Sequence, residues 1–226
     1  ALSAAGLSGI IQALRWSWEP WLAGRFGADL ADDPDIRPGY APAGWTSLVA
    51  HLHRHGVNND ELLASGLAVT ASTGRLIDRF RDRAVFPIVH DQQVLGFVGR
   101  RHPDATDLDH AGPKYLNTAE TSVFHKKRNL YGFNWAKEFI VAQDTAIVVE
   151  GYTDCIACWE AGIKNVVATL GTALTEHHVK TLTRFAKRIV YMFDGDAAGQ
   201  KAALHAFGLD SAFLSQTFVA VADDNL

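Results

Sequence analysis

The sequence has little of what marks secreted, membrane-embedded or uniformly basic proteins. It contains only two cysteines in 226 residues, which is too few for a disulfide framework. No apolar run approaches the roughly 20 residues that span a bilayer, and Ala1–Leu14 lacks the basic and apolar parts of a signal peptide. The net charge of −4 argues against a uniformly basic surface. We therefore expect a cytoplasmic protein that does not bind a membrane.

The two cysteines, Cys155 and Cys158, are spaced so that one helix face would hold both. A zinc site would need two further ligands, for which His177 and His178 are the nearest candidates. We interpret the pair instead as buried thiols that act as small hydrophobic side chains.

What the sequence does have is a hydrophobic content of 48%, enough for the core of one large domain or of two small ones. Its charge is unevenly distributed. Between Arg75 and Arg128 there are ten basic and seven acidic residues, whereas the rest of the chain has 11 basic and 18 acidic residues. This separation suits a protein in which one surface follows phosphates and another binds cations, and a solvated surface of mixed charge is the alternative.

The first part of the chain reads as a mixture of helices and strands, with its first 80 residues mostly helical. The pattern predicts, in order, a helix at 10–21, a loop at 32–44, a helix at 45–52 and a β-hairpin at 84–99. Residues 101–117 read as irregular because they are rich in Pro, Asp and Gly. We therefore expect a mixed α+β subdomain over residues 1–143.

From residue 144 onward, strands and helices alternate with short links. The pattern predicts strands at 147–149, 166–169, 189–193 and 218–222, with helices at 154–160, after Thr175 and at 199–207. Such repeats imply a parallel sheet that helices cover on both faces. The expected fold class is therefore α/β, with a parallel sheet flanked by helices over residues 144–226, preceded by the smaller mixed subdomain.

Two acidic motifs directly follow two of the expected strands. E-G-Y-T-D begins at Glu150, and D-G-D-A-A-G begins at Asp194 and includes Asp196. If the two strands are neighbours, the three carboxylates share the crevice at the strand ends, where they would raise one another's pKa unless a cation neutralised them. A divalent metal such as Mg²⁺ would do so and would serve phosphoryl transfer. The alternative is that Asp194 and Asp196 only cap the following helix.

These motifs resemble the Toprim domain of topoisomerases, primases and some nucleases, and further segments resemble bacterial DnaG-type primases in particular. The primase-like segments occur in the family's order between about residues 39 and 222. They are D-R-F-R-D-R at 78–83, F-P-I at 86–88, G-F-V-G-R at 96–100, K-Y-L-N-T-A-E-T at 114–121, F-H-K at 124–126, L-Y-G at 130–132 and A-T-L-G-T-A at 168–173. The resemblance implies a Toprim-type parallel sheet preceded by a primase-type subdomain with a basic surface.

The resemblance also implies an activity and a set of site residues. The activity is the synthesis of short RNA primers on a single-stranded DNA template from ribonucleoside triphosphates, with Mg²⁺ or Mn²⁺. The implied metal ligands are Glu150, Asp194 and Asp196, with Asp154 beside them and Lys126 as a further catalytic residue. The residues implied to bind nucleotide and template are Arg81, Arg83, Arg100, Lys114, Asn117 and Lys126.

The sequence departs from the family pattern in three respects. It has no zinc-binding module of Cys and His ligands, it has no helicase-contacting region, and it stops at Leu226 before a third acidic motif of the form D-P-D. We therefore expect a fragment, or a shortened relative from a mobile element, with an incomplete second metal site and weak primer synthesis. We also expect a monomer, and helicase contact only through a region absent here. The alternatives are a Toprim-type nuclease and a non-catalytic replication module that binds single-stranded DNA.

Overall fold

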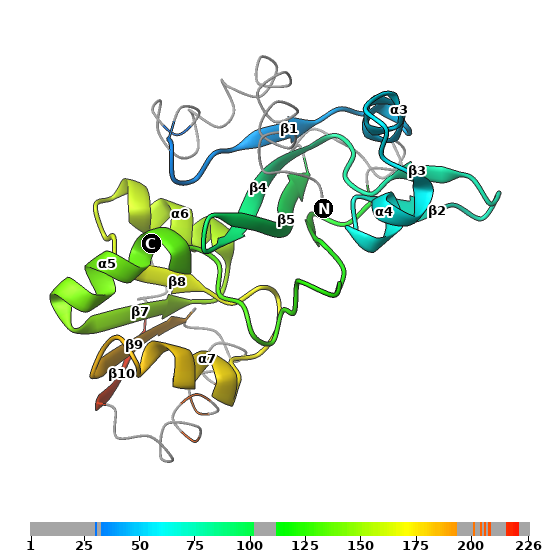
Figure 1. Cartoon of the computed structure of the whole chain (residues 1–226). Helices are drawn as coiled ribbons and strands as arrows, with labels where there is room; N and C mark the ends of the chain where they lie inside the picture. The colour runs from blue at the N-terminus through cyan, green and yellow to red at the C-terminus, as the bar shows by residue number, and fades with distance from the viewer. Residues whose placement is uncertain are drawn as a thin grey trace. The chain divides into compact units, whose positions relative to one another are not determined.

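The protein, described here by a computed structural model, divides into two compact units. The first unit comprises Ala1–Ile88 and Gln93–Phe124, and the second comprises Val89–Gln92 and His125–Leu226. The structure describes residues 30, 33–101, 112–193 and 216–221, together with helical positions 201, 204, 206 and 208 (Figure 1). Within these ranges every helix is too short or too polar to span a lipid bilayer.

A four-stranded sheet with the order β1-β4-β5-β6 lies in the first unit except for the tip of its hairpin, Val89–Gln92, which belongs to the second (Figure 1). Its strands are β1 (Gly39–Ala41), β4 (Arg83–His90), β5 (Gln93–Arg101) and β6 (Tyr115–Asn117). The expected hairpin is confirmed as β4 and β5. Asp91 and Gln92 form its turn with φ angles of 45° and 63°, as a two-residue hairpin turn with two positive φ angles requires.

The described part of the first unit also contains two short helices and a small antiparallel ribbon. They are α3 (Ser47–Arg54), α4 (Asn59–Ala64), β2 (Ala68–Thr70) and β3 (Leu76–Asp78). α3 has no cap from its own N-cap side chain, and Asp78 accepts hydrogen bonds from the main-chain amides of Leu48 and Val49 instead. The core of the unit joins α3 and α4 to the strands, and its buried members are Val49, Leu52, Leu62, Leu67, Ala68, Phe80, Val85 and Phe97.

The expectation of a mostly helical start is wrong for the described residues before position 81. β1, β2 and β3 lie there, and β6 lies in the segment expected to be irregular. Each of these strands has only three residues, so the alternation that identifies a strand is too short to recognise. The expected helix at 10–21 lies outside the described residues.

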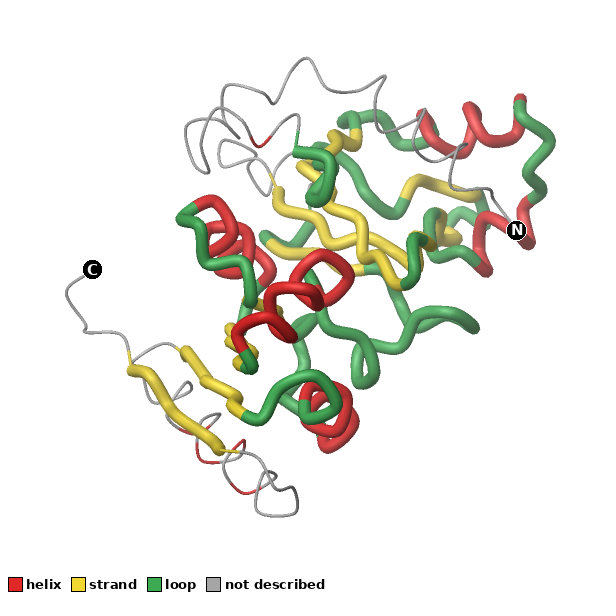
Figure 2. Tube along the Cα trace, turned by 60° about the vertical axis from the view of Figure 1, so that its left-hand side comes forward, coloured by secondary structure: helices red, strands yellow, loops and turns green. Residues whose placement is uncertain are grey.

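The second unit contains a four-stranded sheet with the order β10-β9-β7-β8, in which all neighbouring strands are parallel. The strands are β7 (Thr145–Val149), β8 (Val166–Ala168), β9 (Arg188–Phe193) and β10 (Gln216–Val221). Figure 2 shows β9 and β10 running side by side. The parallel sheet expected from the alternating pattern is confirmed.

Among the described residues before position 194, this sheet is accompanied by α5 (Phe133–Gln143), α6 (Tyr152–Glu160) and α7 (Glu176–Leu182). α5 and α6 pack against β7 and β8, and every residue of β8 is buried, as expected for a parallel strand inside an α/β fold. Cys155 belongs to this core, where burial raises its thiol pKa and its Sγ donates to the carbonyl of Val166. α5 was not expected from the sequence. The parallel alternation begins at Thr145, and the domain division expected at residue 143 stays a prediction.

Candidate metal and nucleotide site

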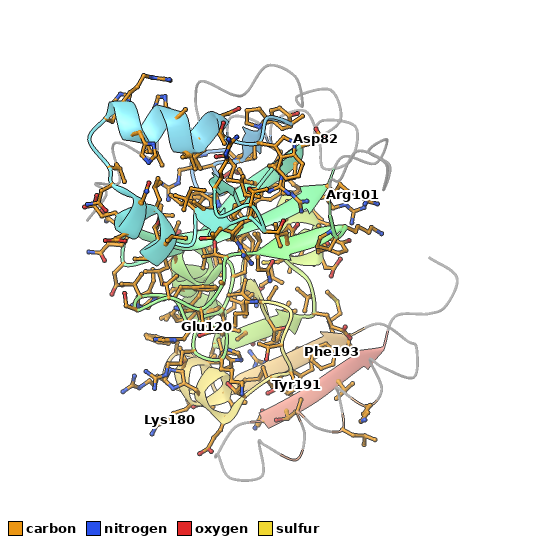
Figure 3. The ribbon with its side chains drawn as sticks, turned by 90° about the vertical axis from the view of Figure 1, so that its right-hand side faces the viewer. Asp82, Arg101, Glu120, Lys180, Tyr191 and Phe193 are labelled. Atoms are coloured by element: carbon orange, nitrogen blue, oxygen red, sulfur yellow. The ribbon has the colours of Figure 1, made fainter. Side chains whose placement is uncertain are left out.

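Glu150 lies at the carboxyl-terminal end of the second unit's sheet, where two neighbouring parallel strands end. β7 ends at Val149, which pairs in register with Met192 of β9, and β9 ends one residue later at Phe193 (Figure 3). The acidic site requires these two strands to be neighbours, and this prediction is therefore confirmed. Asp194 and Asp196 lie outside the described residues, so their place beside Glu150 stays a prediction.

The position of Glu150 is fixed from the end of β8. Thr169 donates from its hydroxyl to the Glu150 carbonyl at 3.1 Å and from its amide to the Val149 carbonyl at 3.3 Å. The Glu150 side chain is half-buried, and its Oε1 is inaccessible to solvent. A half-buried carboxylate at this position suits a hard cation. Burial removes part of the water that stabilises the ionised carboxylate, and a bound cation compensates for that loss. Sequence reasoning did not identify Thr169, although it lies in the A-T-L-G-T-A segment.

Among the residues that the structure describes, no group of three or more His, Cys, Asp or Glu side chains is placed to hold a metal ion. Two of the three expected ligands lie beyond those residues, so the donor set cannot be completed from Glu150 alone. The carboxylate chemistry of Glu150 fits Mg²⁺ or Mn²⁺, both of which take oxygen ligands.

Asp154 caps the beginning of α6. Its Oδ2 accepts a hydrogen bond of 3.1 Å from the Gly151 amide, and its Oδ1 accepts one of 3.4 Å from the Thr153 hydroxyl. A Cβ on residue 151 would lie only 2.7 Å from Oδ2, so glycine allows the carboxylate to approach the main chain. The carboxylate expected beside the metal therefore also fixes the exit of the chain from β7, directly after Glu150.

Lys126 lies in a tight turn of the second unit. The amides of Arg128 and Asn129 donate to the His125 carbonyl, and the Asn129 side chain accepts from the His125 amide at 3.1 Å. The Lys126 side chain is half-buried, whereas Lys127 is exposed. The turn thus holds the main chain of Lys126 while leaving part of its ammonium-bearing side chain in solvent.

His178 contacts this turn from α7, and sequence reasoning missed that role. Its imidazole is buried, which lowers its pKa to about 4. The carbonyls of Lys126 and Asn129 oppose this shift, and the charge of His177 adds to it. His178 is therefore neutral at pH 7, so it can donate from one ring nitrogen and accept at the other.

In the first unit, two of the expected cations surround one exposed aromatic ring. Arg100 on β5 pairs in register with Tyr115 on β6, and its guanidinium carbon lies 4.6 Å from the centre of the Tyr115 ring. The Lys114 ammonium lies 5.5 Å from the same ring centre. Arg100 is only 9% exposed, and its Nη1 has no hydrogen-bond partner among the described residues. This donor is the feature of the first unit best suited to an anionic ligand.

Arg81 lies against a second exposed aromatic ring. Its guanidinium carbon is 4.4 Å from the centre of the Trp45 ring, and its Nη1 donates to the Asp78 carbonyl. Trp45 is 49% exposed, and sequence reasoning did not identify it as a site residue. In Figure 3, Asp82 and Arg101 mark the end of the sheet where β4 begins and β5 finishes, next to Arg81 and Arg100 in the sequence.

Arg83 and Asn117 have structural contacts that sequence reasoning did not anticipate. Arg83 is 1% exposed and donates to the carbonyls of Arg81 and Pro113 at 3.0 and 3.2 Å. The Asn117 carbonyl accepts two hydrogen bonds from Arg79, at 3.1 and 2.7 Å. Contact of Arg83 with nucleotide or template stays a prediction, which the burial of Arg83 disfavours. The hydrogen bonds from Arg79 engage only the main chain of Asn117, and its role in binding also stays a prediction.

Two family models together match most of the chain. The model for the N-terminal domain of the DNA primase catalytic core matches residues 25–137, which is half of the chain, and the Toprim domain model matches residues 144–220. The chain belongs to the DnaG-type DNA primase family. The resemblance and the fold class inferred from the sequence are therefore confirmed.

Curated primases are similar to the chain over part of their length. A DNA primase of Streptomyces coelicolor is 43% identical over 206 residues, which cover 88% of this chain and 31% of the relative. One of Clostridium acetobutylicum is 44% identical over 172 residues, covering 76% of this chain and 28% of the relative. The chain thus spans less than a third of the length of these primases.

Solved primase domains have the same fold. A DNA primase domain from Pseudomonas aeruginosa superposes with a TM-score of 0.84 at 38% identity, covering 99% of this chain and 70% of that one. The RNA polymerase domain of Mycobacterium tuberculosis DnaG gives 0.82 at 36% identity, covering 99% and 77%. A DnaG primase catalytic domain bound to single-stranded DNA gives 0.84 at 33% identity, covering 98% and 72%.

Proposed function

We propose that this chain is the catalytic core of a DNA primase, which makes short RNA primers on single-stranded DNA by metal-dependent nucleotidyl transfer. The observation that carries the proposal is the position of Glu150 at the shared end of β7 and β9, inside the segment that matches the Toprim domain. The ssDNA-bound primase domain of the same fold supports the proposed template.

The carboxylates of the second unit are proposed to hold the metal. Glu150, Asp194 and Asp196 would bind Mg²⁺ or Mn²⁺, which neutralises the charge that builds up on a triphosphate during transfer. Asp154 keeps Glu150 in place by capping α6 at Gly151. Lys126 would bind the triphosphate through its ammonium group, which supplies positive charge where phosphoryl transfer needs it.

The cations of the first unit are proposed to bind nucleotide and template. Arg100 offers a buried Nη1 donor that can meet a phosphate oxygen, and Lys114 adds a second charge beside the same ring of Tyr115. Arg81 extends this set next to Trp45. Because phosphate contacts carry no sequence information, such a surface would hold any single strand. A helicase contact, a monomeric state and a cytoplasmic location stay predictions.

The proposal is tested by metal binding and by synthesis. Calorimetry with Mg²⁺ or Mn²⁺ should show binding to the wild-type chain and loss of that binding in Asp194→Asn. A single-stranded template, labelled ribonucleoside triphosphates and metal should then give short labelled RNA. DNA binding that is indifferent to metal, together with no metal binding by the wild type, would replace the enzyme with a non-catalytic DNA-binding module.

A Toprim-type nuclease is the second candidate, because the Toprim match over residues 144–220 does not depend on the primase-type first unit. The same reaction tests it when the template carries the label instead of the nucleotides. Metal-dependent shortening of the template without RNA synthesis would favour the nuclease.

A further inference from the structure

His178 joins α7 to the turn that carries Lys126. The Nδ1 atom of its buried imidazole accepts a hydrogen bond of 3.3 Å from the Thr175 amide. Its Nε2 lies 3.1 Å from the Lys126 carbonyl, which can only accept, so this nitrogen donates. Only the neutral tautomer with its proton on Nε2 makes both bonds. The imidazole therefore connects the first turn of α7 to a main-chain atom 52 positions earlier in the sequence.

Thr175 makes a second connection next to the first. Its hydroxyl accepts a hydrogen bond of 3.3 Å from the His178 amide and donates one of 2.8 Å to the Lys127 carbonyl. The carbonyls of two consecutive residues, Lys126 and Lys127, are therefore held by the same helix start. This arrangement does more than cap α7, because a cap alone would need only the bonds between Thr175 and His178.

The turn is also fixed beyond Lys127. Tyr131 exchanges two main-chain hydrogen bonds, at 2.8 and 3.0 Å, with Ala168, which is the last residue of β8. The segment between these anchors is short, and no bond of either anchor uses the Lys126 ammonium group. Lys126 thus belongs to a main-chain segment that α7 holds at Lys126 and Lys127 and that β8 holds at Tyr131.

We propose that His178 is a positioning residue for Lys126, which fixes the main chain of the turn so that the lysine meets the nucleotide triphosphate. The inference rests on the proposed function in one respect, which is that Lys126 binds a triphosphate. A binding group must be held within about 0.5 Å of its productive position, so the loss of one anchor should weaken nucleotide binding through Lys126.

Two substitutions separate the two bonds of the imidazole. In His178→Asn, the amide can replace Nδ1 and accept from Thr175, but it is too short to reach the Lys126 carbonyl. In His178→Gln, the longer amide can replace Nε2 and donate to that carbonyl. We expect His178→Asn to weaken the affinity for ATP with Mg²⁺ about five- to tenfold, and His178→Gln to stay within about twofold of the wild type.

A double-mutant cycle with Lys126→Ala decides whether the effect acts through the lysine. If it does, His178→Asn changes the ATP affinity in the wild-type background and not in the Lys126→Ala background. Equal effects in both backgrounds would overturn the proposal, because His178 would then only support the fold. His177→Asn is the matched control, since His177 is the exposed neighbour on the same helix, and it should leave the affinity unchanged.

Hydrogen exchange separates failure of this inference from failure of the proposed function. His178→Asn should speed exchange of the Arg128 and Asn129 amides, which close the turn, whether or not nucleotide is added. Unchanged exchange would overturn the positioning role by itself. A different outcome is that His178→Asn speeds exchange but the wild type binds no ATP. This result would overturn the proposed function, and with it any role of Lys126 in nucleotide binding.

Discussion

The arginines of the first unit and Asp154 of the second unit have opposite charges but are held by the same kind of partner. In the first unit, Arg79 and Arg83 donate to main-chain carbonyls, and Arg100 lies against an aromatic ring. In the second unit, Asp154 accepts from a main-chain amide and a hydroxyl. Neutral partners fix a charged group without cancelling its charge. The charge of each group is thus kept available for a ligand, which would be a phosphate for the arginines and a cation for the carboxylate.

The largest effect should come from removing one negative charge at the end of β7. Glu150→Gln keeps the size of the side chain but weakens metal binding, so we expect RNA synthesis to fall at least about 100-fold. Binding of single-stranded DNA should change little, because Arg81, Arg100 and Lys114, which are proposed to bind the template, lie in the first unit. Primer assays and DNA titrations at fixed salt measure the two effects. Equal loss of both would show that the two units do not divide the work as proposed.

Acid should act on the two units in opposite directions. The pKa of His178 is lowered to about 4 by burial, so the folded second unit binds this proton more weakly than the unfolded chain. Its stability should therefore be full above pH 6.5 and fall by up to about 3 kcal/mol as the pH drops towards 4. His178→Gln should flatten this dependence.

Asp78 gives the first unit the opposite response. Burial raises the pKa of its carboxyl group, although hydrogen bonds from the Leu48 and Val49 amides oppose the shift. Its contribution to stability is therefore present in acid and is lost as the pH rises through the folded-state pKa. Amide exchange of Phe97 and Ala168, corrected for the intrinsic effect of pH, would report the two units separately. Destabilisation of both units in parallel would contradict the contrast.

A smaller effect is expected from Gly151→Ala. The added Cβ would lie 2.7 Å from Asp154 Oδ2, so the carboxylate must move away and the cap of α6 is lost. We expect about 1 kcal/mol of destabilisation, in line with the loss of a helix cap, because a flexible side chain can yield. Thermal unfolding measures it. Gly208→Ala serves as the control in the same unit, since an added Cβ there would meet no atom within 4 Å, and it should cost no stability.

The smallest effect should be a change in salt dependence. Lys114→Met removes one charge beside Tyr115, so the slope of log affinity for single-stranded DNA against log salt should fall by about 0.7. Lys187→Met is the matched control in the second unit, where Lys187 is exposed and lies 4.0 Å from Asp144. A slope that changes equally in both variants would remove the first unit's special role in phosphate binding.

Local pattern predicted the parts of the fold whose elements are long or repeated. The β4–β5 hairpin followed from alternation over two strands, and the parallel sheet followed from buried strands that alternate with helices. β1 and β6 were missed because three residues carry too little pattern, and pairing with β4 and β5 determines their structure. Tertiary contact, rather than local propensity, decides such elements.

The site was predictable where a motif touches the end of a strand. Glu150 follows β7 directly, so its place at the edge of the sheet could be inferred. His178 and Thr175 could not be found in this way, because they bind carbonyls 52 and 48 positions away. Every residue has a carbonyl, so a main-chain acceptor leaves no mark on the sequence. The same reason hid the carbonyl contacts of Arg83.

The anchoring of the Lys126 turn has a consequence for how this segment can vary. Its bonds to α7 and to Ala168 end on the main-chain atoms of Lys126, Lys127 and Tyr131. Substitutions between these anchors leave the main-chain bonds to α7 and Ala168 intact. An inserted or deleted residue would shift one anchor along the chain, so that both sets of bonds could not form together. The length of the segment is therefore constrained more strictly than its composition, in which the Asn129 side chain still matters because it accepts from the His125 amide.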